Sequence, residues 1–240
     1  MYDNNQNNYQ PAYGRGSEAS LQSVVSSTMK KVFVKMTLGI LVTALVSLFC
    51  ATSPAYIGFM ARNSWMMWVL VIAWFGIGIG VSGAINRLSN ATASLLFYLF
   101  AIINGMMLFT IFLAYDTTAI VKTFFITAGT FGAMAVYGYT TSQDLSKFGT
   151  FLIMALFGLI IASVVNIFLH SNTLGWIVSI AGVFIFVGLT AWDTQQVKQM
   201  AAVTPVEFRG RLATLGALNL YLDFVNLFLF LLRIFGGSRD

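Results

Sequence analysis

The sequence predicts an all-α integral membrane protein with seven membrane-spanning helices. Of its 240 residues, 58% are hydrophobic and only 9% are charged, whereas about 25% of the residues in an average soluble domain are charged. So few charges cannot cover a soluble domain of this size, and most of the surface must therefore face a lipid bilayer. Seven separate segments also contain the roughly 20 mostly apolar residues that a spanning helix needs.

A polar segment precedes the first span. Residues 1–20 read MYDNNQNNYQPAYGRGSEAS and have no apolar period, so we expect residues 1–24 to form a disordered tail. Residues 25–240 are expected to form one membrane domain, because the connections between spans have no room for a soluble domain. The single cysteine, Cys50, leaves no intramolecular disulfide and no cysteine-based metal site.

The predicted spans follow one another along this domain. They cover residues 32–53, 65–85, 92–114, 119–139, 148–169, 174–191 and 212–235. The sixth helix is expected to continue beyond the membrane, because TQQVKQMAA consists of good helix formers and no breaker occurs before Pro205. In the second span, Gly76 and Gly80 lie four residues apart, which favours close packing against another helix. The GFGIGIG run around them lacks the strand and helix that flank a phosphate-binding loop.

The basic residues indicate an orientation. With the N-terminus in the cytoplasm and seven crossings, nine Lys and Arg residues lie on the cytoplasmic side and four on the other, as the positive-inside rule requires. A re-entrant last helix would instead return the C-terminus to the cytoplasm. The thirteen basic residues are scattered between apolar runs, which argues against nucleic-acid binding.

Two aspartates stand out because ionisable residues inside a membrane usually mark function. Asp223 is the twelfth residue of the last span, near the bilayer midplane, where an aspartate costs about 2.5–3.5 kcal/mol on insertion scales. Asp193 lies at the cytoplasmic end of the sixth span, and these consecutive helices can pack antiparallel. Because Asp193 is shallower, the two meet only if helix six continues beyond it or helix seven starts outside the bilayer.

The chemistry of such a pair follows from its setting. Two carboxyl groups within hydrogen-bonding reach in a low dielectric share a proton, so the pair can respond to pH near neutrality. When both are ionised, Asp193 and Asp223 are plausible ligands for Ca²⁺, which prefers carboxylate oxygens. The alternative is structural: Asp193 caps a helix end, and Asn or backbone groups satisfy Asp223.

Three segments of the chain resemble signature segments of the Bax inhibitor family, also called transmembrane Bax inhibitor motif proteins. They are YGYTTSQDLSKFG, FVGLTAWDTQ and LGALNLYLDFVNLFLFLLRIFG. The resemblance is to the bacterial inner-membrane branch and covers roughly residues 25–236. It implies six helices wrapped around a central seventh, and a pH-sensitive calcium leak with Ca²⁺ as the transported ion and no cofactor. Asp193 in AWDTQ and Asp223 in LYLDF match the proton-sensing pair of the family.

The resemblance also implies an arginine latch at the cytoplasmic end of the second helix. Arg87 in GAINRLSN is the candidate, although Asn86 could equally hold that position. In this hypothesis the latch holds the charged pair and closes the path, and acidification releases it. Repulsion between two ionised carboxylates would instead open the path at high pH.

Three other functions compete with the leak. Intramembrane aspartyl proteases also pair two aspartates, but Asp223 lacks the expected Gly-x-Gly-Asp context and no proline follows Pro205, so we predict no enzyme. Bacterial members also resemble regulators of a membrane-anchored quality-control protease, and residues 1–20 would then be the docking segment. A coupled transporter would predict broken helices, yet none of the three prolines interrupts a span. The expected partners are thus the bilayer, calcium ions and a membrane-anchored protease.

Overall fold

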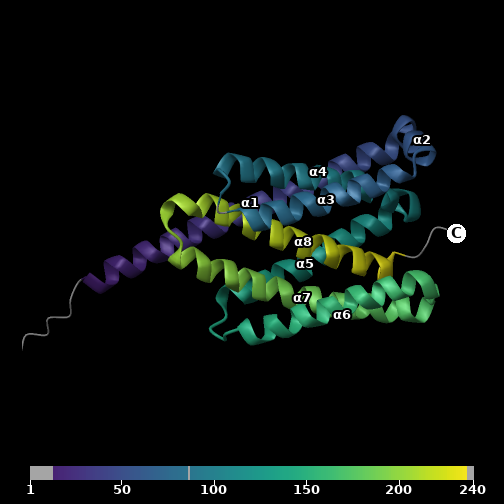
Figure 1. The fold of residues 1–240 in the computed structure, drawn as a ribbon. Helices are drawn as coiled ribbons and strands as arrows, with labels where there is room; N and C mark the ends of the chain where they lie inside the picture. The colour runs from purple at the N-terminus through teal and green to yellow at the C-terminus, as the bar shows by residue number, and fades with distance from the viewer. Residues whose placement is uncertain (1–12, 86, 237–240) are drawn as a thin grey trace, which may run out of the picture.

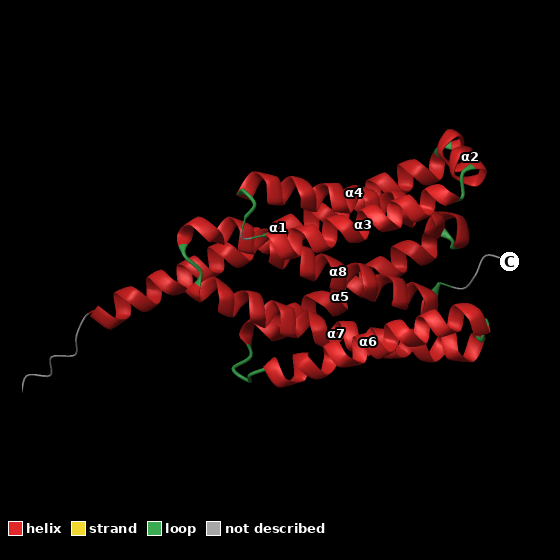
Figure 2. Cartoon of the chain, viewed as in Figure 1, coloured by secondary structure: helices red, strands yellow, loops and turns green. Residues whose placement is uncertain are grey.

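The computed structural model describes residues 13–85 and 87–236, with side chains from residue 20 onward. Figure 2 shows that this part of the chain consists of helices joined by short loops. In chain order the helices are α1 (Tyr13–Thr52), α2 (Pro54–Arg62), α3 (Trp65–Ala84), α4 (Asn90–Ala114), α5 (Thr117–Thr140), α6 (Ser146–Leu169), α7 (Asn172–Val203), the short 3-10 helix η1 (Val206–Phe208) and α8 (Arg209–Phe235). Within the described residues, seven helices are long and apolar enough to cross a membrane, as predicted.

Local sequence explains several helix boundaries. Ser53, Ser89 and Ser171 each precede a helix, and their hydroxyls accept a backbone N–H from its first turn, as N-cap residues commonly do. The sixth predicted span does continue, because α7 runs on to Val203 and ends two residues before Pro205. A proline there cannot supply the N–H that the helix would need.

Helix α8 lies in the middle of the bundle. It packs against α1, α4, α5 and α7, while α3 packs against α4 and α6 packs against α7 to complete the surrounding layer (Figure 1). Leu220, Tyr221 and Leu227 of α8 are fully buried. By contrast, Trp68 of α3 is 70% exposed and Phe168 of α6 is 79% exposed. Large apolar side chains are stable in such positions when they face lipid.

Helix α8 is unbroken from its first residue to its last. It is one continuous helix of 27 residues, about 40 Å long at 1.5 Å per residue, so it is not re-entrant. Figure 1 shows α1 beginning at one end of the bundle and α8 finishing at the other. The side of the membrane on which α1 begins stays a prediction from the charge count.

Two expectations need correction. The predicted disordered tail, residues 1–24, is helical from Tyr13 onward; no proline follows Pro11 before the first span, and residues such as Glu18, Ala19 and Leu21 are compatible with a helix continuous with that span. Residues 1–12 lie outside the described part of the chain. The close packing expected at Gly76 and Gly80 is also wrong, since a Cβ added at either would meet no atom within 4 Å. Helix α3 is an outer helix, and this glycine face points away from the bundle.

Candidate functional site

Asp193 and Asp223 meet in the core between α7 and α8. The two helices are consecutive, antiparallel and extensively packed. Asp193 is 8% exposed and Asp223 is 4% exposed, and their carboxyl groups lie within hydrogen-bonding distance of each other. The structure therefore brings together the two aspartates that the sequence motifs single out.

The lengths of the two helices explain why residues of different predicted depth come together. Helix α7 continues ten residues beyond Asp193 to Val203 (203 − 193), and α8 begins fourteen residues before Asp223 at Arg209 (223 − 209). At 1.5 Å per residue these distances are about 15 Å and about 21 Å. The first condition stated from the sequence holds, because α7 continues beyond Asp193 to Val203. Helix α8 starts only three residues before the predicted span 212–235 (212 − 209), so a start outside the bilayer stays a prediction.

Neighbouring polar side chains make their hydrogen bonds elsewhere and not to the carboxyl groups of Asp193 and Asp223. The hydroxyls of Thr190 and Thr194 donate to carbonyls one turn back in α7, at 2.7 Å each. The Asn226 amide of α8 donates to the Leu222 carbonyl at 2.8 Å, so it does not act on Asp223. The buried Asp223 Oδ2 has no hydrogen-bond partner among the described residues. The structural alternative, in which Asn or backbone groups satisfy Asp223, is therefore not what this geometry displays.

This arrangement limits the chemistry of the site. A direct hydrogen bond between two carboxyl groups requires one proton between them, because an ionised carboxylate only accepts. Among the described residues, no group of three or more His, Cys, Asp or Glu side chains gathers to hold a metal ion. A cation at Asp193 and Asp223 would thus have two carboxylate ligands, which supply at most four of the six to eight oxygens that Ca²⁺ takes.

Helix α7 is held tightly next to Asp193. The Gln195 side chain accepts the N–H of Leu145 at 2.9 Å and donates to the Gln143 carbonyl at 2.7 Å, which fixes the loop between α5 and α6. Lys198 donates to the Tyr139 carbonyl at 2.6 Å and lies 5.0 Å from the centre of the Tyr139 ring. Asp193 therefore sits on a segment with little freedom to move by itself.

Gly138 and Gly149 allow this close packing. A Cβ at Gly138 would lie 2.8 Å from the Cα of Ala191. A Cβ at Gly149 would overlap the indole ring of Trp192. Both glycines therefore bring their helices against the residues that directly precede Asp193.

The structure does not bring Arg87 to the pair. Arg87 is exposed in the turn between α3 and α4, and no ion pair joins it to Asp193 or Asp223 in the described part of the chain. Asn86, the neighbouring candidate, lies outside the described residues. The latch role of Arg87 stays a prediction.

Sequence reasoning missed a buried polar cluster around Tyr221. The Tyr221 hydroxyl lies 2.6 Å from Thr43 Oγ1 on α1 and accepts Asn104 Nδ2 of α4 at 2.7 Å. Thr43 also donates to the Ala101 carbonyl at 2.9 Å. The signal was available, because Asn104 is a strongly polar residue in the middle of a span, and such residues usually bond across helices.

Lys35 forms a second inter-helix link that the sequence did not reveal. Its ammonium group donates to Ser94 Oγ on α4 and to Thr214 Oγ1 on α8, at 2.6 Å each. The charge count from the sequence places Lys35 among the nine basic residues of the predicted cytoplasmic side, but in the structure it joins three helices. Nothing in its local sequence distinguishes it from a lysine that extends to the membrane surface.

Comparison with known proteins identifies the family of this chain and several relatives. The family model described as "Inhibitor of apoptosis-promoting Bax1" matches residues 25–240, which include both aspartates. The chain belongs to the Bax inhibitor family. It is 45% identical over 214 residues to the Inner membrane protein YbhL of Escherichia coli, covering 88% of this chain and 92% of that protein. A protein of Borreliella burgdorferi is 43% identical, covering 88% and 92% of the two chains.

This membership agrees with the resemblance drawn from the sequence motifs. The similarity to an inner membrane protein, together with the seven apolar helices, indicates a multi-pass inner membrane protein. The family description names no enzymatic activity.

Proposed function

We propose that this Bax inhibitor family protein is a pH-sensitive calcium leak pathway and that the Asp193–Asp223 pair is its proton sensor. The observation that supports this proposal is the meeting of two carboxyl groups in the membrane core, one with an unpartnered oxygen. Buried ionisable groups are costly in a bilayer and usually serve transport or sensing. No residue is assigned a catalytic role, and the protein is proposed not to be an enzyme.

The sensor would act through the proton that the two carboxyl groups share. Acidification protonates both carboxyl groups and removes the charge of the pair. Loss of the shared proton instead leaves two carboxylates, which repel each other and attract a cation. Either change alters the force between α7 and its neighbours. Arg87 is kept as the proposed latch; because it lies exposed in this structure, it would engage only after α3 moves.

Calcium flux in liposomes tests this function. Purified protein is reconstituted with an internal calcium dye, and calcium uptake is recorded at about pH 6 and about pH 8, values on either side of neutrality. We expect the wild type to leak with a pH dependence that Asp193→Asn and Asp223→Asn both lose. Asp144→Asn is the matched control, because Asp144 is an exposed carboxylate in the loop between α5 and α6. A pH profile that survives in Asp223→Asn, or absence of flux from correctly inserted wild type at both pH values, would refute the proposal.

A second candidate function is regulation of a membrane-anchored quality-control protease. The observation that favours it is the N-terminal part of α1, which projects beyond the other helices (Figure 1). A projecting helix offers a docking element that the membrane does not cover. Deleting residues 2–20 should abolish capture of the protease from detergent-solubilised membranes and leave calcium flux intact. Undiminished capture by the shortened protein would remove this candidate.

A further inference from the structure

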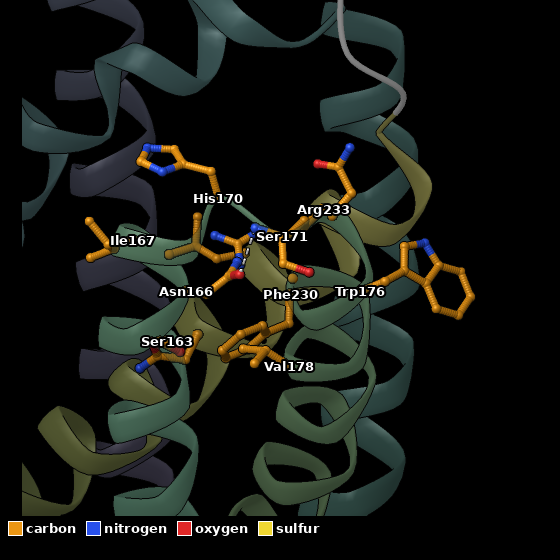
Figure 3. Close-up of a pocket in the computed structure, with 13 residues that line it drawn as sticks. Ser163, Asn166, Ile167, His170, Ser171, Trp176, Val178, Phe230 and Arg233 are labelled. Atoms are coloured by element: carbon orange, nitrogen blue, oxygen red, sulfur yellow. Dashed lines mark hydrogen bonds between the residues drawn. The ribbon is translucent and has the colours of Figure 1, made fainter.

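A pocket opens at the end of the bundle where α6 and α8 finish and α7 begins. Its volume is about 780 Å³, and its lining comes from these three helices and the turn between α6 and α7. In Figure 3, His170, Ser171 and Arg233 lie toward the helix termini, whereas Ser163, Val178 and Phe230 lie deeper in the bundle. The pocket is distinct from the aspartate pair, since neither Asp193 nor Asp223 lines it.

The lining has a polar part and an apolar part. Asn166, Ser171, Asn172 and Asn226 contribute amides and a hydroxyl, whereas apolar side chains such as Phe230 form the rest. Asn166 Oδ1 accepts the N–H of Ser171 at 3.2 Å. This bond leaves the Asn166 amide nitrogen as a donor, and it lies next to the first turn of α7, 3.2 Å from where a Gly175 Cβ would be. The pocket therefore combines hydrogen-bond donors with a hydrophobic wall.

The charged side chains that line the pocket have one sign. Among the described residues that line it, Arg233 is the only Lys or Arg, and none is Asp or Glu. A guanidinium beside amide donors matches a phosphate oxygen well, because arginine binds phosphate with charge-assisted hydrogen bonds.

The position of the pocket favours the phosphate of a lipid headgroup over a soluble phosphate. The ends of three spanning helices mark the depth at which lipid headgroups lie, and the 58% exposed Trp176 at the rim is a residue type enriched at that depth. A ligand that places an anion near Arg233 and hydrocarbon along the apolar wall is a phospholipid. A soluble anion would use only the polar half.

We propose that this pocket binds the headgroup phosphate of an anionic phospholipid, with Arg233 as the principal ligand and Asn166 as a supporting donor. The competing explanation is that Arg233 only stabilises the last turn of α8, where basic residues complement the helix dipole. That role would give no preference among lipids. The proposal is independent of calcium transport, since it rests on a different set of residues.

Native mass spectrometry of the full chain, released from membranes of defined composition, tests the proposal. The measured quantity is the ratio of bound phosphatidylglycerol to bound phosphatidylcholine when both are offered equally. A basic residue near an anionic headgroup contributes about 1 kcal/mol, so we expect roughly a fivefold preference for phosphatidylglycerol in the wild type. Arg233→Gln should reduce the ratio to about one.

Two further variants separate a pocket from general surface charge and from misfolding. Asn166→Asp keeps the oxygen that accepts the Ser171 N–H but places a carboxylate beside Arg233, so it should also abolish the preference. Arg62→Gln removes a positive charge from the exposed Arg62 at the end of α2, on the same end of the bundle (Figure 1), and should retain the wild-type ratio. If Arg233→Gln does not fold, Asn166→Asp decides the question.

Three outcomes would overturn the proposal. The first is a preference that survives in Asn166→Asp or in folded Arg233→Gln. The second is an equal loss in Arg62→Gln, which would indicate nonspecific surface charge. The third comes from a parallel measurement in which inorganic phosphate is added to protein in phosphatidylcholine membranes. If phosphate raises the melting temperature as much as phosphatidylglycerol does, the pocket takes a free anion and not a lipid.

Discussion

Gly138→Ala tests how closely α5 must approach α7 beside the aspartate pair. A Cβ at this position would overlap the carbonyl oxygen of Ala191 and lie 2.8 Å from its carbonyl carbon and Cα. All three atoms belong to backbone in the middle of a helix, so they cannot rotate away as a side-chain end would. Overpacking of this kind costs about 1–3 kcal/mol, occasionally more, against a gain of about 1 kcal/mol from the higher helix propensity of alanine.

Gly132→Ala is the matched control, because it lies on the same helix and a Cβ there meets no atom within 4 Å. The propensity gain is shared by both variants, so the difference between their unfolding free energies isolates the steric cost. We expect Gly138→Ala to be less stable than Gly132→Ala by about 1–3 kcal/mol, measured by SDS-induced unfolding in mixed micelles. Equal stabilities within about 0.5 kcal/mol would show that α5 yields easily, and the close-packing argument would be wrong.

Three further changes test other contacts. Tyr221→Phe removes the acceptor of Asn104 Nδ2 and leaves a buried donor, so the unfolding free energy should fall by about 1–3 kcal/mol; the double variant with Asn104→Leu should recover part of it. Gln195→Leu removes two hydrogen bonds to loop 141–145, so amide hydrogen exchange should accelerate there and not in the central helix; uniform protection would contradict this. Hydrogen bonds from the side chain and then the backbone N–H of the first residue of α6 hold the pKa of Asp144 below its usual value of 3.8, so its stabilising contribution is complete above that value and is lost as pH falls through the folded pKa. Asp144→Ala should therefore melt below the wild type at neutral pH and approach it at low pH, and a constant gap would refute the assignment.

The spans could be predicted from the sequence because a bilayer imposes one simple requirement. Each backbone polar group in the hydrocarbon must bond within its own helix, so length and hydropathy suffice to locate the helices. The sequence predicts contact between Asp193 and Asp223 only if one of the two helices is longer than its apolar span. The good helix formers after Asp193 favour such a longer helix, and α7 does extend to Val203.

Contacts made by outer helices were harder to predict. The spacing of Gly76 and Gly80 indicates that another helix can approach closely, but it does not say which side of α3 faces the bundle. Close approach instead occurs at Gly105, where a Cβ would lie 2.7 Å from the Thr43 carbonyl oxygen. The position of Arg87 was equally open, because a long side chain in a turn is not fixed by helical periodicity.

The central place of α8 follows from its polar residues. Helices in a bilayer gain little from hydrophobic association, since lipid tails are as apolar as leucine, so small and polar side chains decide which surfaces meet. Helix α8 has such residues on several sides: Thr214 reaches Lys35, Tyr221 reaches Asn104 and Asp223 reaches Asp193. No single neighbour could satisfy all three, so the helix must be surrounded. Helix α6 has no comparable set and keeps residues such as Phe168 toward lipid. The carboxyl pair is thus one of several polar contacts that hold α8 in the core, and changing its charge alters forces on the helix that most of the bundle packs around.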